Sequence, residues 1–145
     1  MSAENKMLKN RLGLLGWVSA GRYGLERYAY TLHRLTGLGI LLYFILHIFV
    51  TGSRLGGTQS WADAMQRFEN PYFKFGEFLL FLAFAFHALN GIRLIITELG
   101  IMIGKPERPL FPYVTSLHKQ RPLFIIVMIV AAILMILGGA DFYLI

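Results

Sequence analysis

Two histidines, His47 and His87, are the residues whose type and position most directly suggest chemistry. Each lies well inside a long apolar stretch, where an ionisable side chain is rare and indicates a functional site. A neutral imidazole is also the usual protein ligand of a non-covalent haem iron. The alternative is a structural histidine that hydrogen-bonds a neighbouring helix, so position alone leaves haem ligation and a packing role both open.

The spacing of these histidines predicts that they do not share one iron. If the stretch around His47 is helical, His47 lies about 21 Å along the helix axis from His33. The helix that carries His87 must run in the opposite direction, and His87 follows Phe75 by about 18 Å of rise. The two histidines therefore sit at different depths, and we expect each to need a second axial histidine from another chain.

Small residues accompany the histidines on their helix faces. His33 and Gly37 follow helical spacing on the first helix, and Ala83 and Gly91 lie one turn before and after His87 on the second. Small side chains beside His87 predict room for a flat macrocycle. Close packing of two helices explains the same residues equally well.

Two arginines lie near the ends of these helices. Arg34, next to His33, could pair with a haem propionate or donate to a quinone carbonyl, and Arg93 admits the same interpretation. The alternative for both is an arginine that reaches out to lipid phosphate. We expect His118, in a basic loop, to be a surface residue. Since no nucleophile–base set, phosphate-binding glycine loop or paired carboxylate site is visible, the chain alone is not expected to catalyse bond breaking.

Three apolar stretches must position these side chains. They cover about residues 35–50, 75–96 and 123–137. A membrane span needs roughly 20 residues, and the first and third stretches reach that length with their flanks. Within lipid the backbone can satisfy its own hydrogen bonds only as helix. The sequence therefore predicts an all-α membrane protein with three transmembrane helices.

Proline, asparagine and glycine mark the expected helix ends. Gly52 closes the first helix, Asn70-Pro71 opens the second, and Gly100 closes it. Arg121-Pro122 opens the third helix, and Gly138-Gly139 is expected to end it. We divide the chain accordingly into an N-terminal segment, a transmembrane haem-binding domain and a short outer tail, at residues 1–29, 30–139 and 140–145. Residues 4–18 are expected to form a short interfacial helix or a segment docked on a soluble partner.

Composition restricts the possible cofactors and partners. The chain has 145 residues, 56% of them hydrophobic, and is too apolar for a soluble domain of this size. It has no cysteine, so it cannot ligate an iron–sulfur cluster or attach a c-type haem covalently. Its net charge of +6 comes from basic residues at the ends of the helices, which argues against nucleic-acid binding.

The distribution of basic residues predicts the orientation in the membrane. Lysines and arginines are frequent before the first helix and between the second and third, and absent after Gly139. The positive-inside rule then places the N-terminus in the cytoplasm and the C-terminus outside.

Two motifs carry a resemblance to a known family. His33-Arg34-Leu35-Thr36-Gly37 resembles the His-Arg-x-Ser/Thr-Gly motif of the cytochrome b membrane-anchor subunit of succinate dehydrogenase. The segment from His87 to Arg93 resembles the second signature of that family, His-x-x-x-Gly-Ile-Arg. Both motifs fall on the expected helices, and the resemblance covers roughly residues 27–138.

The resemblance implies a cofactor, a role for several residues and a set of partners. His87 corresponds to the axial ligand of haem b, and Arg34 to a residue of the quinone site near the haem propionates, with His33 beside it. His47 is similar to the histidine that ligates a second haem in members with two. The implied partners are a flavoprotein, an iron–sulfur subunit and a second membrane anchor, which would complete the helical bundle and supply the opposite axial histidines. Electrons would pass to membrane quinone, in the cytoplasmic membrane of a prokaryote.

Some positions depart from the family pattern. Tyr30, followed by Thr31, stands where the family often has a serine that contacts quinone, and Leu94 stands where it often has histidine. Glu98 replaces the more usual aspartate. These departures concern the quinone contacts and one propionate contact, and not His87. Two alternative functions stand beside the haem-binding anchor: an anchor of the same complex without haem, and a small transporter that uses the histidines to relay protons.

Overall fold

The computed structural model describes residues 25–105 and 119–144 of the chain. It divides into two compact units, residues 1–32 and 33–145. The expected interfacial helix at residues 4–18 and the loop residue His118 lie outside the described residues. The second unit contains both motif histidines and is the one that bears on function.

Three helices are long and apolar enough to cross a membrane. They are α2 (Leu25–Gly52), which continues from the first unit into the second, α4 (Pro71–Glu98) and α5 (Arg121–Leu144). No strand occurs in the described residues. The predicted fold class, an all-α membrane protein with three transmembrane helices, is confirmed.

The ends of α4 show why it begins and stops where the sequence predicted. The Asn70 side-chain oxygen accepts a hydrogen bond from the Tyr72 backbone N–H at 3.0 Å, and Pro71 occupies the first turn. At the other end Gly100 has a φ of 78°, a left-handed conformation that glycine adopts at little cost. The N–H groups of Gly100 and Ile101 then bond back to the carbonyls of Thr97 and Ile96, which closes the helix as a Schellman motif.

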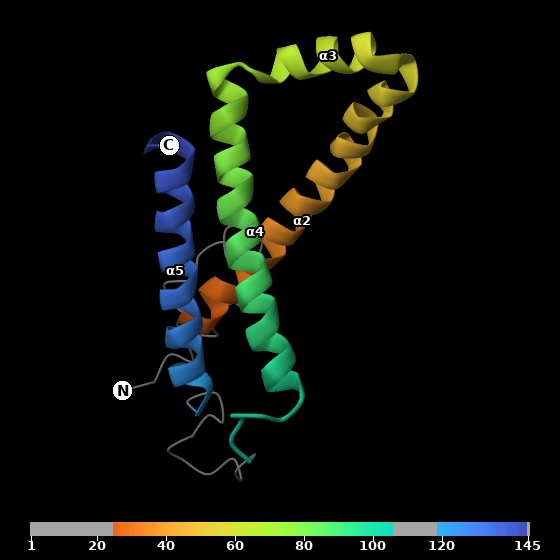
Figure 1. Ribbon diagram of the computed structural model, residues 1–145. Coiled ribbons are helices and arrows are strands. Elements are labelled where there is room, and N and C mark those ends of the chain that lie inside the picture. Colours follow the sequence, from red (N-terminus) through yellow and green to blue (C-terminus); the bar gives the residue numbers. More distant parts are fainter. Residues whose placement is uncertain (1–24, 106–118, 145) are drawn as a thin grey trace, which may run out of the picture. The chain divides into compact units, whose positions relative to one another are not determined.

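A further helix joins α2 to α4, which the sequence analysis did not predict. A short 3-10 turn, η2 (Ser53–Gly56), leads into α3 (Gly57–Phe68). Figure 1 shows α3 bridging the end of α2 and the start of α4. Four apolar residues of α3 recur at helical spacing and are only partly exposed: Trp61, Ala64, Met65 and Phe68. Helix α3 is therefore amphipathic, as interfacial helices are.

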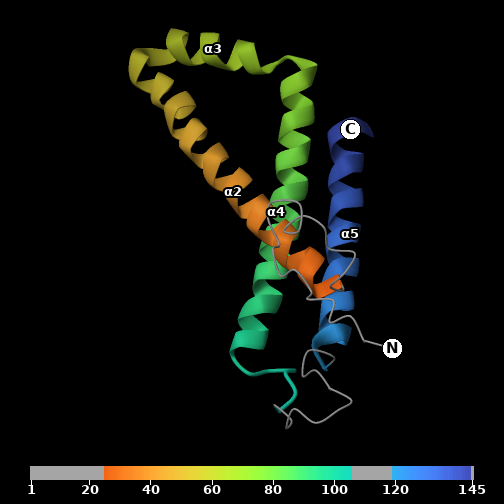
Figure 2. The ribbon, with the colours of Figure 1, turned by 180° about the vertical axis from the view of Figure 1, so that it is seen from behind.

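Helices α4 and α5 lie side by side and antiparallel, as two opposite views show (Figures 1 and 2). The expectation that Gly138-Gly139 ends the third helix is wrong, because α5 continues to Leu144. The two glycines instead face phenylalanine rings of α4: a Cβ at Gly138 would overlap the Phe81 ring, and one at Gly139 would lie 3.5 Å from Phe78. Small residues let membrane helices approach closely, so this pair is a packing site and not a helix stop.

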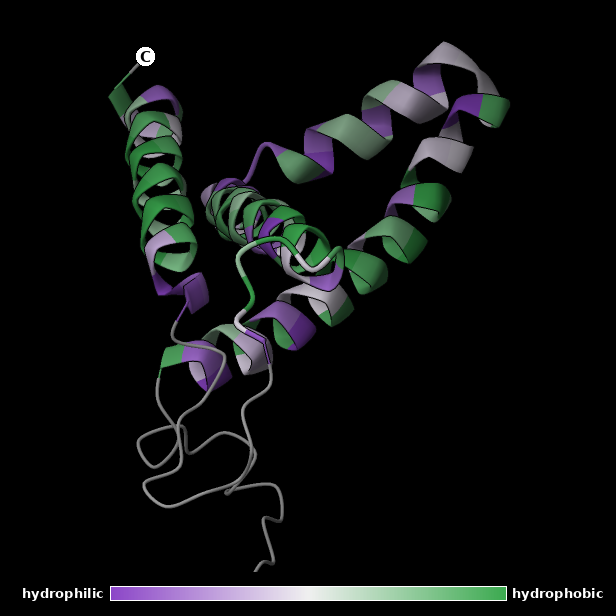
Figure 3. Ribbon diagram, turned by 90° about the horizontal axis from the view of Figure 1, so that it is seen from below, coloured by the Kyte–Doolittle hydropathy of each residue, from purple (hydrophilic) through white to green (hydrophobic). Residues whose placement is uncertain are grey.

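Much of the apolar surface of α5 is exposed in this chain. Figure 3, coloured by hydropathy, shows the helix that leads to the C-terminus as hydrophobic along most of its length. Its buried residues are Phe124, Val127 and Ala131, whereas Ile136 is 71% exposed. Such a surface suits lipid or another apolar helix.

We predict that Gly138→Ala loosens the contact between α4 and α5. The new methyl group would overlap the Phe81 ring, and overpacking of this kind costs about 1–3 kcal/mol. Thermal unfolding of the purified protein in detergent should show a lowered midpoint. Gly76→Ala on α4 is the matched control, since a Cβ there meets nothing within 4 Å. Equal midpoints for the two variants would contradict this account of the packing.

Candidate functional site

The structure brings His33 of α2 and His87 of α4 into direct contact. Their rings are stacked, with centroids 3.9 Å apart and planes 5° from parallel. Helix α2 crosses α4 in this region and diverges from it toward α3 (Figures 1 and 2). The two motifs that the sequence analysis singled out therefore meet at one place, although sequence alone did not predict that the rings touch.

A glycine on each helix makes this contact possible. A Cβ at Gly37 would lie 2.8 Å from Cε1 of His87, and one at Gly91 would lie 3.5 Å from Cε1 of His33. Each histidine thus packs on the glycine of the opposite helix. The space that Gly91 was expected to leave for a macrocycle is, in this chain, next to the His33 ring. Both glycines therefore serve close packing of α2 against α4, which was the alternative explanation for the small residues.

The hydrogen bonds of His87 fix which of its nitrogens carries the proton. Nδ1 lies 3.0 Å from the backbone oxygen of His33 and 3.2 Å from the Thr36 hydroxyl. The Thr36 hydroxyl donates its own proton to the His33 carbonyl at 3.0 Å, so both neighbours act as acceptors toward Nδ1. A neutral His87 then carries its proton on Nδ1 and keeps the lone pair on Nε2. Among the described residues no group hydrogen-bonds Nε2.

An open groove runs along α4 beside the histidine pair. Its volume is about 380 Å³, and its lining includes His33, His87, Gly91, Ile95 and Glu98. Nδ1 of His33 is buried and has no hydrogen-bond partner within residues 25–105 and 119–144. A buried polar atom without a partner is costly and calls for an explanation, such as a ligand atom or a water. The site therefore offers a lone pair on one histidine and an unused nitrogen on the other.

Arg93 lies behind this site and is not at the lipid surface. It is 2% exposed, and it donates from Nε to the Asn90 side-chain oxygen at 3.0 Å and from a terminal nitrogen to Gln120 at 3.1 Å. Its guanidinium carbon lies 5.2 Å from the centre of the Phe124 ring. Because the Arg93 side chain is buried, the alternative that it reaches out to lipid phosphate is wrong. Arg93 instead ties α4 to the start of α5, and the sequence analysis missed Gln120 as its partner.

His47 occupies a different place, as its sequence position predicted. It is fourteen residues beyond His33 on α2, or about 21 Å along the helix. Its Nδ1 lies 3.2 Å from the Tyr43 hydroxyl. It lines a cavity of about 430 Å³ between α2, α3 and α4, whose wall also includes Trp61 and Glu77. The structure does not bring His47 to His87.

The remaining predicted site residues precede or follow His33 on α2. Arg34 is exposed, and Tyr30 and Thr31 belong to the first unit. No group of three or more histidine, cysteine or acidic side chains that could hold a metal occurs in the described part of the chain.

Comparison with known proteins gives a consistent family assignment. Residues 5–137 match the family described as succinate dehydrogenase/fumarate reductase transmembrane subunit. The chain is 35% identical over 74 residues to a succinate dehydrogenase hydrophobic membrane anchor subunit of Archaeoglobus fulgidus, which covers 51% of this chain and 63% of that protein. It is 28% identical over 85 residues to the subunit of the same name from Halobacterium salinarum, covering 58% and 65%.

The matched regions therefore span somewhat less than two thirds of the length of these two curated relatives. No solved structure matches the chain.

We predict that Gly37→Ala displaces the His87 ring, because the added methyl group would come within 2.8 Å of Cε1. Nitrogen NMR of the protein labelled with ¹⁵N-histidine should show altered His87 signals and a weakened Nδ1 hydrogen bond. Gly39→Ala, two residues along the same helix, is the control, since a Cβ there meets nothing within 4 Å. Unchanged His87 signals in Gly37→Ala would show that the crossing does not depend on this glycine.

Proposed function

We propose that this chain, which belongs to the succinate dehydrogenase/fumarate reductase transmembrane subunit family, binds haem b through His87 and carries electrons toward membrane quinone. The chain is an integral membrane protein. The proposal rests on one observation above all: His87 is held by Nδ1 and has Nε2 available. Nε2 is the atom through which His87 would bind the haem iron.

The residues around His87 suit an axial ligand. A metal-bound histidine almost always donates its other N–H to a carbonyl or carboxylate, which fixes the tautomer and orients the ring. The His33 carbonyl and the Thr36 hydroxyl are placed to do this for His87. The same bond would also hold a purely structural histidine, so Nε2 and the adjoining groove are what favour ligation. Bound haem would supply one-electron redox chemistry at this depth of the membrane.

The proposal requires partner subunits. His87 gives one axial ligand, and we infer that a second membrane anchor supplies the opposite histidine and covers the exposed apolar faces of the bundle. A flavoprotein and an iron–sulfur subunit would deliver electrons, because this chain has no cysteine to ligate a cluster. This chain would then only transfer electrons, and the oxidation of succinate or the reduction of fumarate would occur in the partner subunits.

We propose a quinone contact at the start of α2. The buried Nδ1 of His33 has no hydrogen-bond partner among the described residues, so it would donate to a quinone carbonyl or accept from a quinol hydroxyl, depending on its tautomer. Arg34 follows it and is a candidate for a haem propionate or a quinone carbonyl. Arg93, buried against Gln120, would act by holding α4 and α5 together behind the site.

We propose that His47 ligates a second haem. It lies about 21 Å along α2 from His33, so this haem would sit at another depth from the first. The Tyr43 hydroxyl, 3.2 Å from Nδ1, would orient the ring as Thr36 does for His87. We further infer a prokaryotic cytoplasmic membrane, with the N-terminus in the cytoplasm and the C-terminus outside.

The first test is His87→Ala in the purified complex. We expect the haem served by His87 to be lost, measured as the reduced-minus-oxidised b-type spectrum and by haem quantification. Thr36→Val is the matched variant: it removes a neighbour of Nδ1 but leaves Nε2, so the haem should remain with a shifted midpoint potential. A full haem spectrum in His87→Ala, with normal assembly, would refute the assignment and favour an anchor without haem.

The second test is His47→Ala. If His47 ligates a haem of its own, the variant should lose one of two haems and retain the spectrum and potential of the other. Haem quantification per complex, with the subunits identified by mass spectrometry, measures this directly. If the native complex contains only one haem, the assignment of His47 as a haem ligand is wrong, whereas the assignment of His87 is unaffected.

A further inference from the structure

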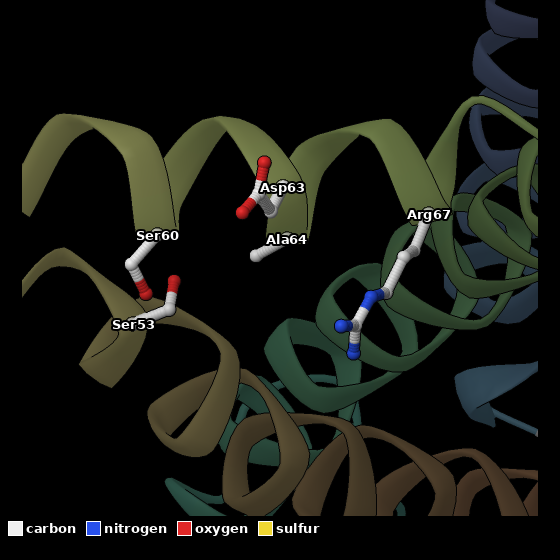
Figure 4. A pocket seen from close by; sticks show the side chains of 5 residues that line it. All are labelled: Ser53, Ser60, Asp63, Ala64 and Arg67. Carbon is white, nitrogen blue, oxygen red and sulfur yellow. The ribbon is translucent and has the colours of Figure 1, made fainter. Parts of the chain in front are cut away.

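The end of the molecule at α3 carries a polar pocket that the proposed electron path does not use. It has a volume of about 340 Å³ and is lined by Ser53, Ser60, Asp63, Ala64 and Arg67. Figure 4 shows the hydroxyls of Ser53 and Ser60 close together, with Asp63 and Arg67 on successive turns of α3. The pocket lies where α2 ends and the amphipathic helix begins, which is where a membrane helix meets the headgroup layer.

The two charged residues of the pocket do not satisfy each other. Asp63 accepts a hydrogen bond from Gln59 at 2.9 Å, and the Arg67 side chain extends below α3, with its guanidinium apart from the Asp63 carboxylate (Figure 4). Arg67 makes no hydrogen bond or ion pair with any described residue, although residues four apart on a helix are neighbours. The N–H groups of the Arg67 guanidinium thus lie one helical turn from the Asp63 carboxylate and are not used by it. This arrangement suits a ligand that has an anionic and a cationic group close together.

An apolar hollow continues from this pocket. It has a volume of about 280 Å³ and shares Ser53, Ala64 and Arg67 with the polar pocket, while its other walls include Phe49 and Phe68. A free phosphate ion would use only the polar half. An amphipathic molecule with a charged head and a hydrocarbon chain would use both halves.

We propose that this slot binds a zwitterionic phospholipid of the outer end of the bundle, with its phosphate on Arg67, its ammonium toward Asp63 and an acyl chain along Phe49 and Phe68. Arginine is well suited to phosphate because its planar fork makes two parallel hydrogen bonds. The lipid would pin α3 to the interface and so fix the distance between the ends of α2 and α4. It is a site separate from the histidine pair.

The test measures lipid binding to the purified complex by native mass spectrometry. The probe is phosphatidylethanolamine, compared with diacylglycerol of the same chains and with inorganic phosphate. We expect Arg67→Gln to weaken phosphatidylethanolamine binding about tenfold, the size of one lost charge-assisted contact. Arg54→Gln is the matched control: it removes the same charge at the same end, but Arg54 stacks on Trp61 at 4.2 Å and does not line the pocket.

A second variant tests the apolar half without changing charge. Ala64→Leu places a larger side chain where the two hollows join, so it should also reduce phosphatidylethanolamine binding while the spectrum of the complex stays the same. Equal losses in Arg67→Gln and Arg54→Gln would show unspecific attraction and overturn the site. Competition by inorganic phosphate at equal strength, or equal binding of diacylglycerol, would overturn the lipid assignment as well.

Discussion

The Nδ1 hydrogen bond from His87 to the His33 carbonyl is the constraint around which the functional end of this molecule is arranged. It joins α4 to α2 across a crossing where the helices touch through Gly37 and Gly91, and it decides the tautomer of the ring. In lipid there is no water to compete for the same donor, so the bond holds the imidazole in one orientation. The free nitrogen and the groove along α4 are consequences of that orientation.

The second organising interaction is the buried arginine. Asn90 and Gln120 are placed on either side of Arg93, so a charge that would be costly in the interior is hydrogen-bonded there. Asn90 is itself fully buried and lies one turn from His87 on the same helix. The polar residues of α4 therefore have different partners: His87 contacts α2, whereas Arg93, which is hydrogen-bonded to Asn90, contacts Gln120 and Phe124.

Much of the fold could be predicted because the bilayer imposes it. Apolar stretches of sufficient length must be helices, and Asn70-Pro71 and Gly100 mark the ends of α4 by known backbone chemistry. Helix α3 was missed because its apolar residues are few and its stripe is short. The end of α5 was misjudged because glycine stops a helix in water but serves as a contact surface between membrane helices, as at Gly138.

The site could be predicted only in part. The motifs identified His33, His87 and Arg93, but the stacking of the two rings and the role of Gln120 depend on how the helices cross, which no spacing along one helix encodes. One prediction from spacing did carry over: fourteen residues of helix separate His33 from His47, and the structure does not bring His47 to His87.

The position of Arg93 also bears on how the chain enters the membrane. Arg93 lies near the C-terminal end of α4, and α5 follows α4 in the sequence and is therefore synthesised after it. A charged side chain within a membrane span is costly on insertion. Gln120, which accepts a hydrogen bond from Arg93, is made 27 residues later. Arg93 therefore gains this partner only after the start of α5 has been made, so the hydrogen bond to Gln120 forms once both helices have been synthesised.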